Sequence, residues 1–446
     1  MIMPRSSLAS VGIDVGEQTE PLARPSSDVP FRILVAGDFT AGTGRNRRPT
    51  NVDRDNFDAV LKLFAPRLQL GDMTFNFREL DDFHPDRLVE RLPEPSVRED
   101  NPAAKTASKA AAAEATPLNL SGADLLRQMM GEDVAPAPIP RRSDWDRLID
   151  DIVAPYGQPK PDPREAHRAA QRDAVRSLQM RALLHHPKFQ ALEAAWRGLY
   201  FLTRRLETHE YLKVYIMDLP QEELATPAGL ATLQRAAVEE ASGTFGGEPW
   251  AAIAGLYYFP PGDEAVLTQI AGIARKAEAP FLAGVAPDVV GLTHMFSNLR
   301  RSADARWVGL ALPRFLLRLP YGKDTDAAET FAFEEMPSPP EHERYLWGHP
   351  AIALAYLLGA AYTREGWSLR PGVVSDIDNL PLHVYKQDGE PQLKPCAEIL
   401  LTEDAAETLL ERGLMPVASV KGTDRVKLVR FQSVAEPPAS LAGKWK

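Results

Sequence analysis

The sequence predicts an α/β protein in which a small α/β module is tethered to a larger α/β domain with a mixed sheet and packed helices. Short apolar runs, typical of buried strands, alternate with stretches in which apolar residues recur at helical spacing. A segment rich in Pro, Ala, Glu, Lys and Ser separates two such regions. The 446 residues are enough for two or three domains with full-size cores.

The composition argues against several functions. The net charge is −10 with acids and bases interleaved, which argues against a nucleic-acid partner and against wholesale binding to anionic membrane. The N-terminus lacks the apolar core of a signal peptide, and there is no uninterrupted apolar run of about 18 residues, which argues against direct membrane insertion. Cys396 is the only cysteine, so no intramolecular disulfide can form, and we expect a buried, inert thiol. These features predict a cytoplasmic protein.

The chain begins with an extended arm, residues 1–28, which is either disordered or pairs with a partner. The small module follows at 29–92, and its first strand, Phe31–Ala36, runs into the loop GDFTAGTGRNRR. The glycines of this loop have the separation of a phosphate-binding loop, but Thr43-Gly44 stands where Lys and Ser or Thr are needed. We therefore expect a turn without a nucleotide. The remaining predicted elements are a helix from Asp53, a strand at Met73–Phe77 and a short helix ending near Leu92.

A flexible linker is predicted at 93–140, because few of its residues could join a core. One short amphipathic helix interrupts it at 118–130, where Leu125, Leu126 and Met129 lie on the apolar side. This helix is either incidental packing or a peptide that docks in a partner's groove. Leu125, Leu126 and Met129 are thus the candidate partner-binding residues.

The larger domain is predicted at 141–435, with structure resuming at Trp145–Val153, and it is organised around residues 172–219. A helix here carries one wide apolar stripe that includes Phe189, Trp196 and Leu199. Pro187 suits the first turn of that helix and ends the one before it, so we expect His185-His186 to mark a helix boundary rather than a metal or catalytic site.

Further elements of the larger domain follow from periodicity and from turn and capping residues. They are strands at Leu212–Leu219, Ala251–Phe259 and Phe281–Ala286, helices at Pro227–Ala241, Ala265–Ala277, His349–Tyr362 and Thr402–Arg412, a hairpin turn at Asp388-Gly389, closing strands at Val417–Val420 and Val426–Phe431, and a tail at 436–446.

No catalytic, cofactor or metal site is predicted. Glu248 has no second carboxylate at a spacing that suits acid–base chemistry. Glu334-Glu335 could hold a metal in principle, but we expect both to be exposed, solvated acids.

Several multi-residue strings resemble one family, the contractile sheath of the type VI secretion system, which normally consists of two separate proteins. The strings that resemble the small sheath subunit are PFRILV at 30–35, GDF at 37–39, VDRDNFD at 52–58, APRL at 65–68 and LDDFHP at 80–85. Those that resemble the large subunit are LHHPKFQALE at 184–193, WRGL at 196–199, GTFGGEP at 243–249, LPRFLLRLPYG at 312–322 and YLWG at 345–348.

The resemblance implies a natural fusion of the two subunits with a structural, non-enzymatic role. Such subunits self-associate into a helical sheath around an inner tube of ring proteins, and contraction of the sheath ejects that tube. The implied partners are further copies of the chain, the inner-tube ring protein, the baseplate and a recycling AAA+ unfoldase, which would bind the helix at 118–130.

Two functions remain open from the sequence: a sheath subunit, or a non-polymerising accessory factor that caps or docks on a sheath or baseplate. Both stay open because the usual subunits continue beyond the residues that match, and the further segments serve assembly. A sheath subunit needs open strand edges, and we expect the arm at 1–28 and the closing strands between Val417 and Phe431 to supply them.

Overall fold

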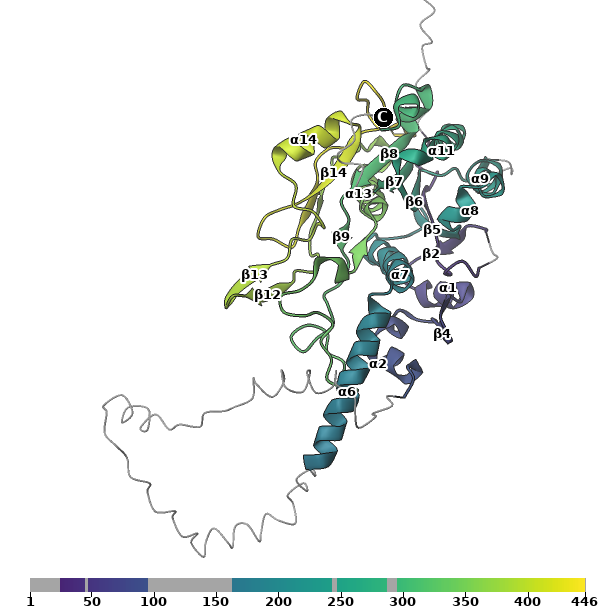
Figure 1. Cartoon of the computed structure of the whole chain (residues 1–446). Helices are drawn as coiled ribbons and strands as arrows, with labels where there is room; N and C mark the ends of the chain where they lie inside the picture. Colours follow the sequence, from purple (N-terminus) through teal and green to yellow (C-terminus); the bar gives the residue numbers. More distant parts are fainter. Residues whose placement is uncertain (1–24, 45–46, 95–162, 243–246, 287–294, 446) are drawn as a thin grey trace, which may run out of the picture.

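The chain forms a mixed sheet between two layers of helices (Figure 1). This computed structural model describes residues 25–44, 47–94, 163–242, 247–286 and 295–445. In those residues the sheet has nine strands, in the order β11-β15-β14-β8-β7-β6-β1-β5-β2. Their bounds are Asp376–Ile377, Val426–Leu428, Leu414–Ser419, Val308–Leu312, Phe281–Val285, Ala252–Phe259, Phe31–Gly37, Leu212–Asp218 and Thr50–Val52.

The predicted α/β class with a mixed sheet is confirmed. The six strands from β14 to β5 run parallel, whereas β2, β15 and β11 are antiparallel to their neighbours. Nothing in the sequence indicated that β1, from the small module, lies between β5 and β6 of the larger domain. Ile33, for example, is opposite Val214 on one side and Ala252 on the other. The two predicted units therefore share one sheet.

Strand β1 shows why the sheet needs helices on both faces. Phe31, Ile33 and Val35 belong to the core on one face, and Leu34 and Ala36 to the core on the other. The first core is covered by α1 (Phe57–Phe64), α7 (Pro187–Arg205) and α13 (Pro350–Glu365). The second is covered by α9 (Pro227–Gln234) and α11 (Glu264–Ala277).

The remaining elements surround this sandwich. They are α2 (Pro85–Leu88), α6 (Pro163–Leu184), α8 (Gln221–Leu224), α10 (Glu240–Ser242), α12 (Ser297–Arg300), α14 (Glu403–Glu411) and the pairs β3 (Arg67–Leu70) with β4 (Met73–Asn76), β9 (Phe315–Leu316) with β10 (Trp347–Gly348), and β12 (Val384–Gln387) with β13 (Glu390–Leu393). The predicted hairpin turn is confirmed, because Asp388 and Gly389 both have positive φ, at 53° and 83°.

Two helices differ from the prediction in more than their last residue. The first helix begins at Phe57 rather than Asp53, because the Asp53 carboxylate accepts the N–H groups of Asp55 and Asn56 and closes a turn there. The helix predicted at Pro227–Ala241 contains a π-helical turn at Arg235–Glu239.

The C-terminal segment packs onto the body. The Lys444 ammonium is buried and donates to the carbonyls of Trp250, Ala277 and Glu278. Trp445 is buried as well.

Several predictions lie outside the described residues. They concern residues 1–24 of the arm, most of the linker, the helix at 118–130 with Leu125, Leu126 and Met129, and the segment Trp145–Val153. Among the helices that are described, none combines the length and the apolar character that a membrane span requires.

Candidate assembly surfaces and a buried ion-pair network

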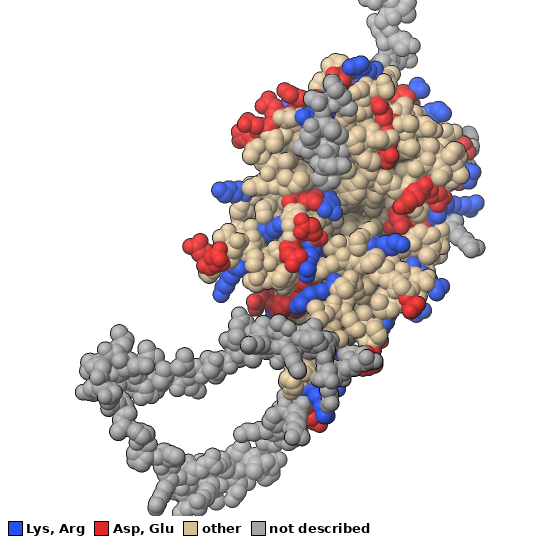
Figure 2. All heavy atoms as spheres, in the orientation of Figure 1, with Lys and Arg blue, Asp and Glu red and all other residues tan. Residues whose placement is uncertain are grey.

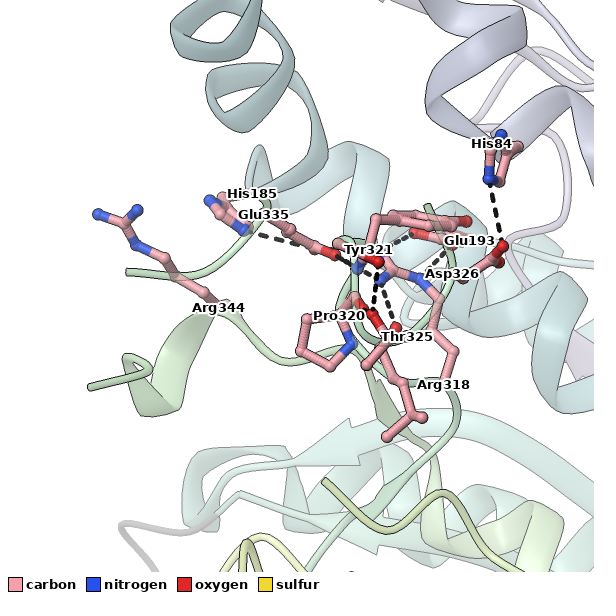
Figure 3. Close-up of polar contacts among 12 residues, drawn as sticks. His84, His185, Glu193, Arg318, Pro320, Tyr321, Thr325, Asp326, Glu335 and Arg344 are labelled. Carbon is pink, nitrogen blue, oxygen red and sulfur yellow. Dashed lines mark hydrogen bonds and ion pairs between the residues drawn. The ribbon is translucent and has the colours of Figure 1, made fainter. Parts of the chain in front are cut away.

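A buried ion-pair network joins α7 to the segment 314–335 (Figure 3). The Arg318 guanidinium lies between two carboxylates: its Nε is 2.8 Å from Glu193 Oε1, and its Nη1 is 2.7 Å from Glu335 Oε2. The side chains of Glu193 and Glu335 are 0% and 1% exposed. Arg318 also lies 4.1 Å over the ring of Tyr321. Each buried charge thus has an oppositely charged partner. The attraction between the partners offsets the cost of removing them from water.

Glu335 is the best-satisfied acid of this network. Burial by itself would raise its pKa, but Arg318 and the hydrogen bonds that it accepts outweigh burial and lower the pKa to about 2. One of these bonds comes from the Tyr321 N–H at 2.8 Å. The prediction that Glu334-Glu335 are both exposed is therefore wrong for Glu335, since Arg318 allows it to be buried, and holds for Glu334.

The small module reaches the same segment. The His84 ring packs edge-on against Tyr321, with 4.9 Å between ring centres, and its Nε2 lies 3.6 Å from Asp326 Oδ1. Asp86 accepts the Thr330 N–H at 2.9 Å and the Thr330 hydroxyl at 2.6 Å. Three of the strings that suggested the sheath family, around residues 84, 193 and 318, therefore meet in space, although they lie far apart in the chain.

His185-His186 mark the helix boundary as predicted. Helix α6 ends at Leu184 and α7 begins at Pro187. The His186 Nδ1 accepts the Lys188 N–H at 3.2 Å and so caps α7. In the described part of the chain, no three His, Cys, Asp or Glu side chains are grouped as metal ligands.

The loop after β1 is closed by a carboxylate of the chain itself. Asp218, at the end of β5, accepts the Phe39 N–H at 2.9 Å and the Thr40 hydroxyl at 2.9 Å, and it pairs with Arg47 at 2.6 Å. Burial raises the pKa of Asp218, against the lowering effect of these donors. The Asp218 carboxylate thus takes up donors of the loop that a phosphate-binding loop would leave free for phosphate. This agrees with the expected turn without a nucleotide. No sequence signal near the loop pointed to Asp218.

The strand edges differ from the expectation. Strand β14 pairs with β8 through residues 414–416 and with β15 through residues 417–419, and β15 pairs with β14 and β11, so both closing strands lie within the sheet rather than at its edge. The expectation of open edges there is wrong for this reason.

The hairpin β12–β13 is instead exposed, and its cross-strand partners Val384 and Leu393 are 57% and 44% exposed. It is an exposed apolar edge of the kind that other strands can join.

Cys396 is buried, and burial raises the pKa of its thiol to about 11, as expected for an inert cysteine.

Comparisons with known proteins agree with both sets of sequence strings. The family model of the VipB (EvpB) tail sheath N-terminal domain matches residues 167–297 and 293–435, and that of the type VI secretion system protein VipA matches residues 21–96. The type VI secretion system sheath protein TssC1 of Pseudomonas aeruginosa is 34% identical over 299 residues, which are 59% of this chain and 60% of the relative.

Among solved structures, a chain from a cryo-EM structure of the anti-feeding prophage baseplate is similar over 55% of this chain and 51% of its own length. Its identity is 13% and its TM-score 0.30. The VipB model spans more than half of this chain, and the VipA model lies before it. The chain therefore belongs to the tail sheath family of type VI secretion systems, and it joins a small-subunit segment and a large-subunit segment in one polypeptide.

Proposed function

We propose that this chain is a structural subunit of a type VI contractile sheath, which assembles with further copies around an inner tube and ejects that tube by contraction. The observation that carries the proposal is the position of β1. The small-subunit segment supplies a central strand between β5 and β6 of the large-subunit segment, so a single chain contains a joint core of both subunit types. Fusion enforces equal numbers of the two segments and keeps them at high effective concentration.

The proposed work needs no active site. Energy is stored in the packing difference between an extended and a contracted assembly, and rigid subunits that shift against one another release it. The buried network around Arg318 suits this role, because it ties α7, the segment 314–335 and the small-subunit segment into one unit. The protein is accordingly proposed to be non-enzymatic and to act in the bacterial cytoplasm.

The proposed partners are the inner-tube ring protein, the baseplate and a recycling AAA+ unfoldase. For the unfoldase we propose the segment 118–130, with Leu125, Leu126 and Met129 as contacts. A pull-down tests this: Leu125→Asp with Leu126→Asp is expected to abolish binding of the unfoldase, whereas Ala111→Asp in the same linker leaves it intact. Undiminished binding by the double variant would remove the segment from the proposal.

Negative-stain microscopy tests the main proposal. The chain is produced alone and together with the inner-tube ring protein, and we expect tubes in at least the second sample. Deleting residues 1–28 is expected to abolish tubes while thermal melting shows an unchanged fold. Compact particles under both conditions would overturn the proposal and support the accessory or capping factor instead.

A further inference from the structure

An exposed apolar groove lies between α14, strand β14 and the residues that follow β15. Its volume is about 360 Å³, and its apolar lining includes Leu401, Ala406, Leu410 and Val429. Val429 is 41% exposed although it is a large aliphatic residue. Such a hollow, rimmed by polar side chains, is typical of an interaction site. We refer to it as the α14 groove.

One rim of the α14 groove is acidic. Glu403, Glu407 and Glu411 follow one another at intervals of four residues along α14, and all three are exposed. None of their carboxylates has an ion-pair partner among the described residues. Arg430 also lines the groove, so the lining carries three negative charges and one positive charge. Figure 2 shows acidic side chains gathered over α14.

Helix α6 carries a matching basic row. Arg168, Arg172 and Arg176 also follow at intervals of four residues. Arg168 and Arg172 are exposed, Arg176 is half-buried, and none of the three forms an ion pair with another described residue. The N-terminal part of α6 projects from the body of the molecule (Figure 1). We refer to this row as the α6 arginine row.

The α14 groove and the α6 arginine row have the same spacing of charged residues and opposite signs of charge. Residues four apart on a helix are about 6 Å apart along its axis, so the acidic and basic rows have the same spacing. Arg and Glu side chains at that spacing can pair one to one.

One chain cannot bring its own two surfaces together. Helix α6 projects at one end of the molecule and α14 lies near the other (Figure 1). A contact between them must therefore join two copies. Because the two surfaces differ, the contact is head-to-tail and each added copy leaves a free surface at both ends.

We propose that the α6 arginine row of one copy docks in the α14 groove of the next copy. This inference rests on the proposed sheath function and names a contact that would carry the assembly. The occupant of the groove is a second copy of the chain rather than the segment 118–130, because the basic row of α6 matches the acidic row of α14 in number and spacing.

Charge reversal tests the contact. Glu407→Lys alone and Arg172→Glu alone are each expected to lower the fraction of protein that pellets as assemblies roughly tenfold, because like charges then face each other. Two reversals away from both surfaces serve as controls. Asp58→Lys changes an exposed acid on α1, and Arg370→Glu changes an exposed arginine elsewhere. Both controls are expected to assemble like the unmodified chain.

Mixing gives the decisive result. The Glu407→Lys and Arg172→Glu variants, mixed in equal amounts, are expected to recover assembly by alternating along the chain of copies. The introduced lysine of one variant then faces the introduced glutamate of the other in half of the contacts, and the original charges meet in the other half. A misfolded variant could not be rescued in this way. Failure of the mixture, or full assembly by each single variant, would overturn the inference.

A crosslinking experiment distinguishes failure of this docking contact from failure of the proposed sheath function. Arg172→Cys in one preparation and Glu407→Cys in another are expected to form a covalent dimer with a thiol-reactive bis-maleimide long enough to span an Arg–Glu pair, while buried Cys396 stays unreactive. If the unmodified chain never forms tubes but this dimer forms, the docking stands and the sheath function fails. If tubes form and the dimer is absent, the docking fails and the sheath function stands.

Discussion

Trp196 makes more aromatic ring contacts than any other residue of α7. Its side chain is fully buried, its indole N–H donates to the Phe39 carbonyl at 2.9 Å, and the rings of Phe39, Phe57 and Phe64 pack edge-on around it. All three of these rings belong to the small-subunit segment. A single side chain of α7 thus contacts three aromatic rings of the small-subunit segment.

Replacing this ring should be costly. Trp196→Ala is expected to lower the free energy of unfolding by about 3–5 kcal/mol, through lost apolar burial and the cavity that remains. Urea unfolding measures the loss. Trp196→Phe keeps most of the apolar volume and should lose less, and equal losses for the two variants would show that the indole hydrogen bond, not the packing, is what matters.

His349 gives a pH-dependent prediction at the residue scale. Its Nδ1 accepts the Ala351 N–H at the start of α13, and its Nε2 lies 3.0 Å from the Tyr257 carbonyl. Burial, assisted by the positive charge of Arg314, lowers the pKa of His349 to about 3. The folded protein therefore keeps this imidazole neutral at pH values at which the unfolded chain takes up a proton.

The contribution of His349 to the free energy of unfolding is fully present above about pH 6.5. It decreases by about 1.4 kcal/mol for each unit by which the pH falls below that value. His349→Asn retains a cap acceptor without the titration. Urea unfolding between pH 6.5 and 5 should show a steeper loss for the unmodified chain than for this variant. The exposed His167→Asn serves as the control and should keep the steep loss. Parallel curves for all three would show that His349 is not the titrating group.

At the scale of elements, the network around Arg318 fixes α7 to the segment 314–335. Glu335→Gln removes one of the two carboxylates that flank the guanidinium and should lower the free energy of unfolding by about 3 kcal/mol at neutral pH. Since the pKa of Glu335 is lowered to about 2, its contribution should be present above about pH 4.5 and fade towards pH 2.

Unfolding at pH 7 and pH 3 measures both effects. The neighbouring Glu334→Gln is the matched control, because Glu334 is exposed, and its change should stay within about 0.5 kcal/mol. A loss for Glu335→Gln that is as large at pH 3 as at pH 7 would mean that side-chain packing, rather than charge, holds the segment.

At the scale of the whole molecule, the shared sheet predicts that the covalent linker is not what holds the two segments together. Strand β1 pairs with β5 along all seven of its residues and with β6 along four. A protease site inserted between residues 105 and 110 should therefore yield two fragments that elute together in gel filtration and separate only in denaturant. Separation in native buffer would show that the linker is needed to keep β1 in place.

Local signals in the sequence predicted many elements because the causes of those elements are local. Pro350 after His349 begins a helix, Thr402 caps another, and Asp388-Gly389 adopts the positive φ values of a tight hairpin. The family strings are likewise contiguous, which is why the resemblance to the sheath family is visible in the sequence by itself. The candidate contacts Leu125, Leu126 and Met129 remain predictions.

Only the tertiary structure decided which distant residues meet. The run FRILVA predicts a strand buried on both faces, but its apolar side chains do not specify β5 and β6 as neighbours. The sequence predicts Glu335 in solvent because a carboxylate is costly to bury alone, and its partner Arg318 is brought to it by the fold. The pairing of Asp218 with the loop after β1 and the exposure of the charged rows on α6 and α14 have the same origin. Periodicity and capping act within a few residues, whereas strand order, charge pairing and exposed faces depend on contacts between segments far apart in the chain.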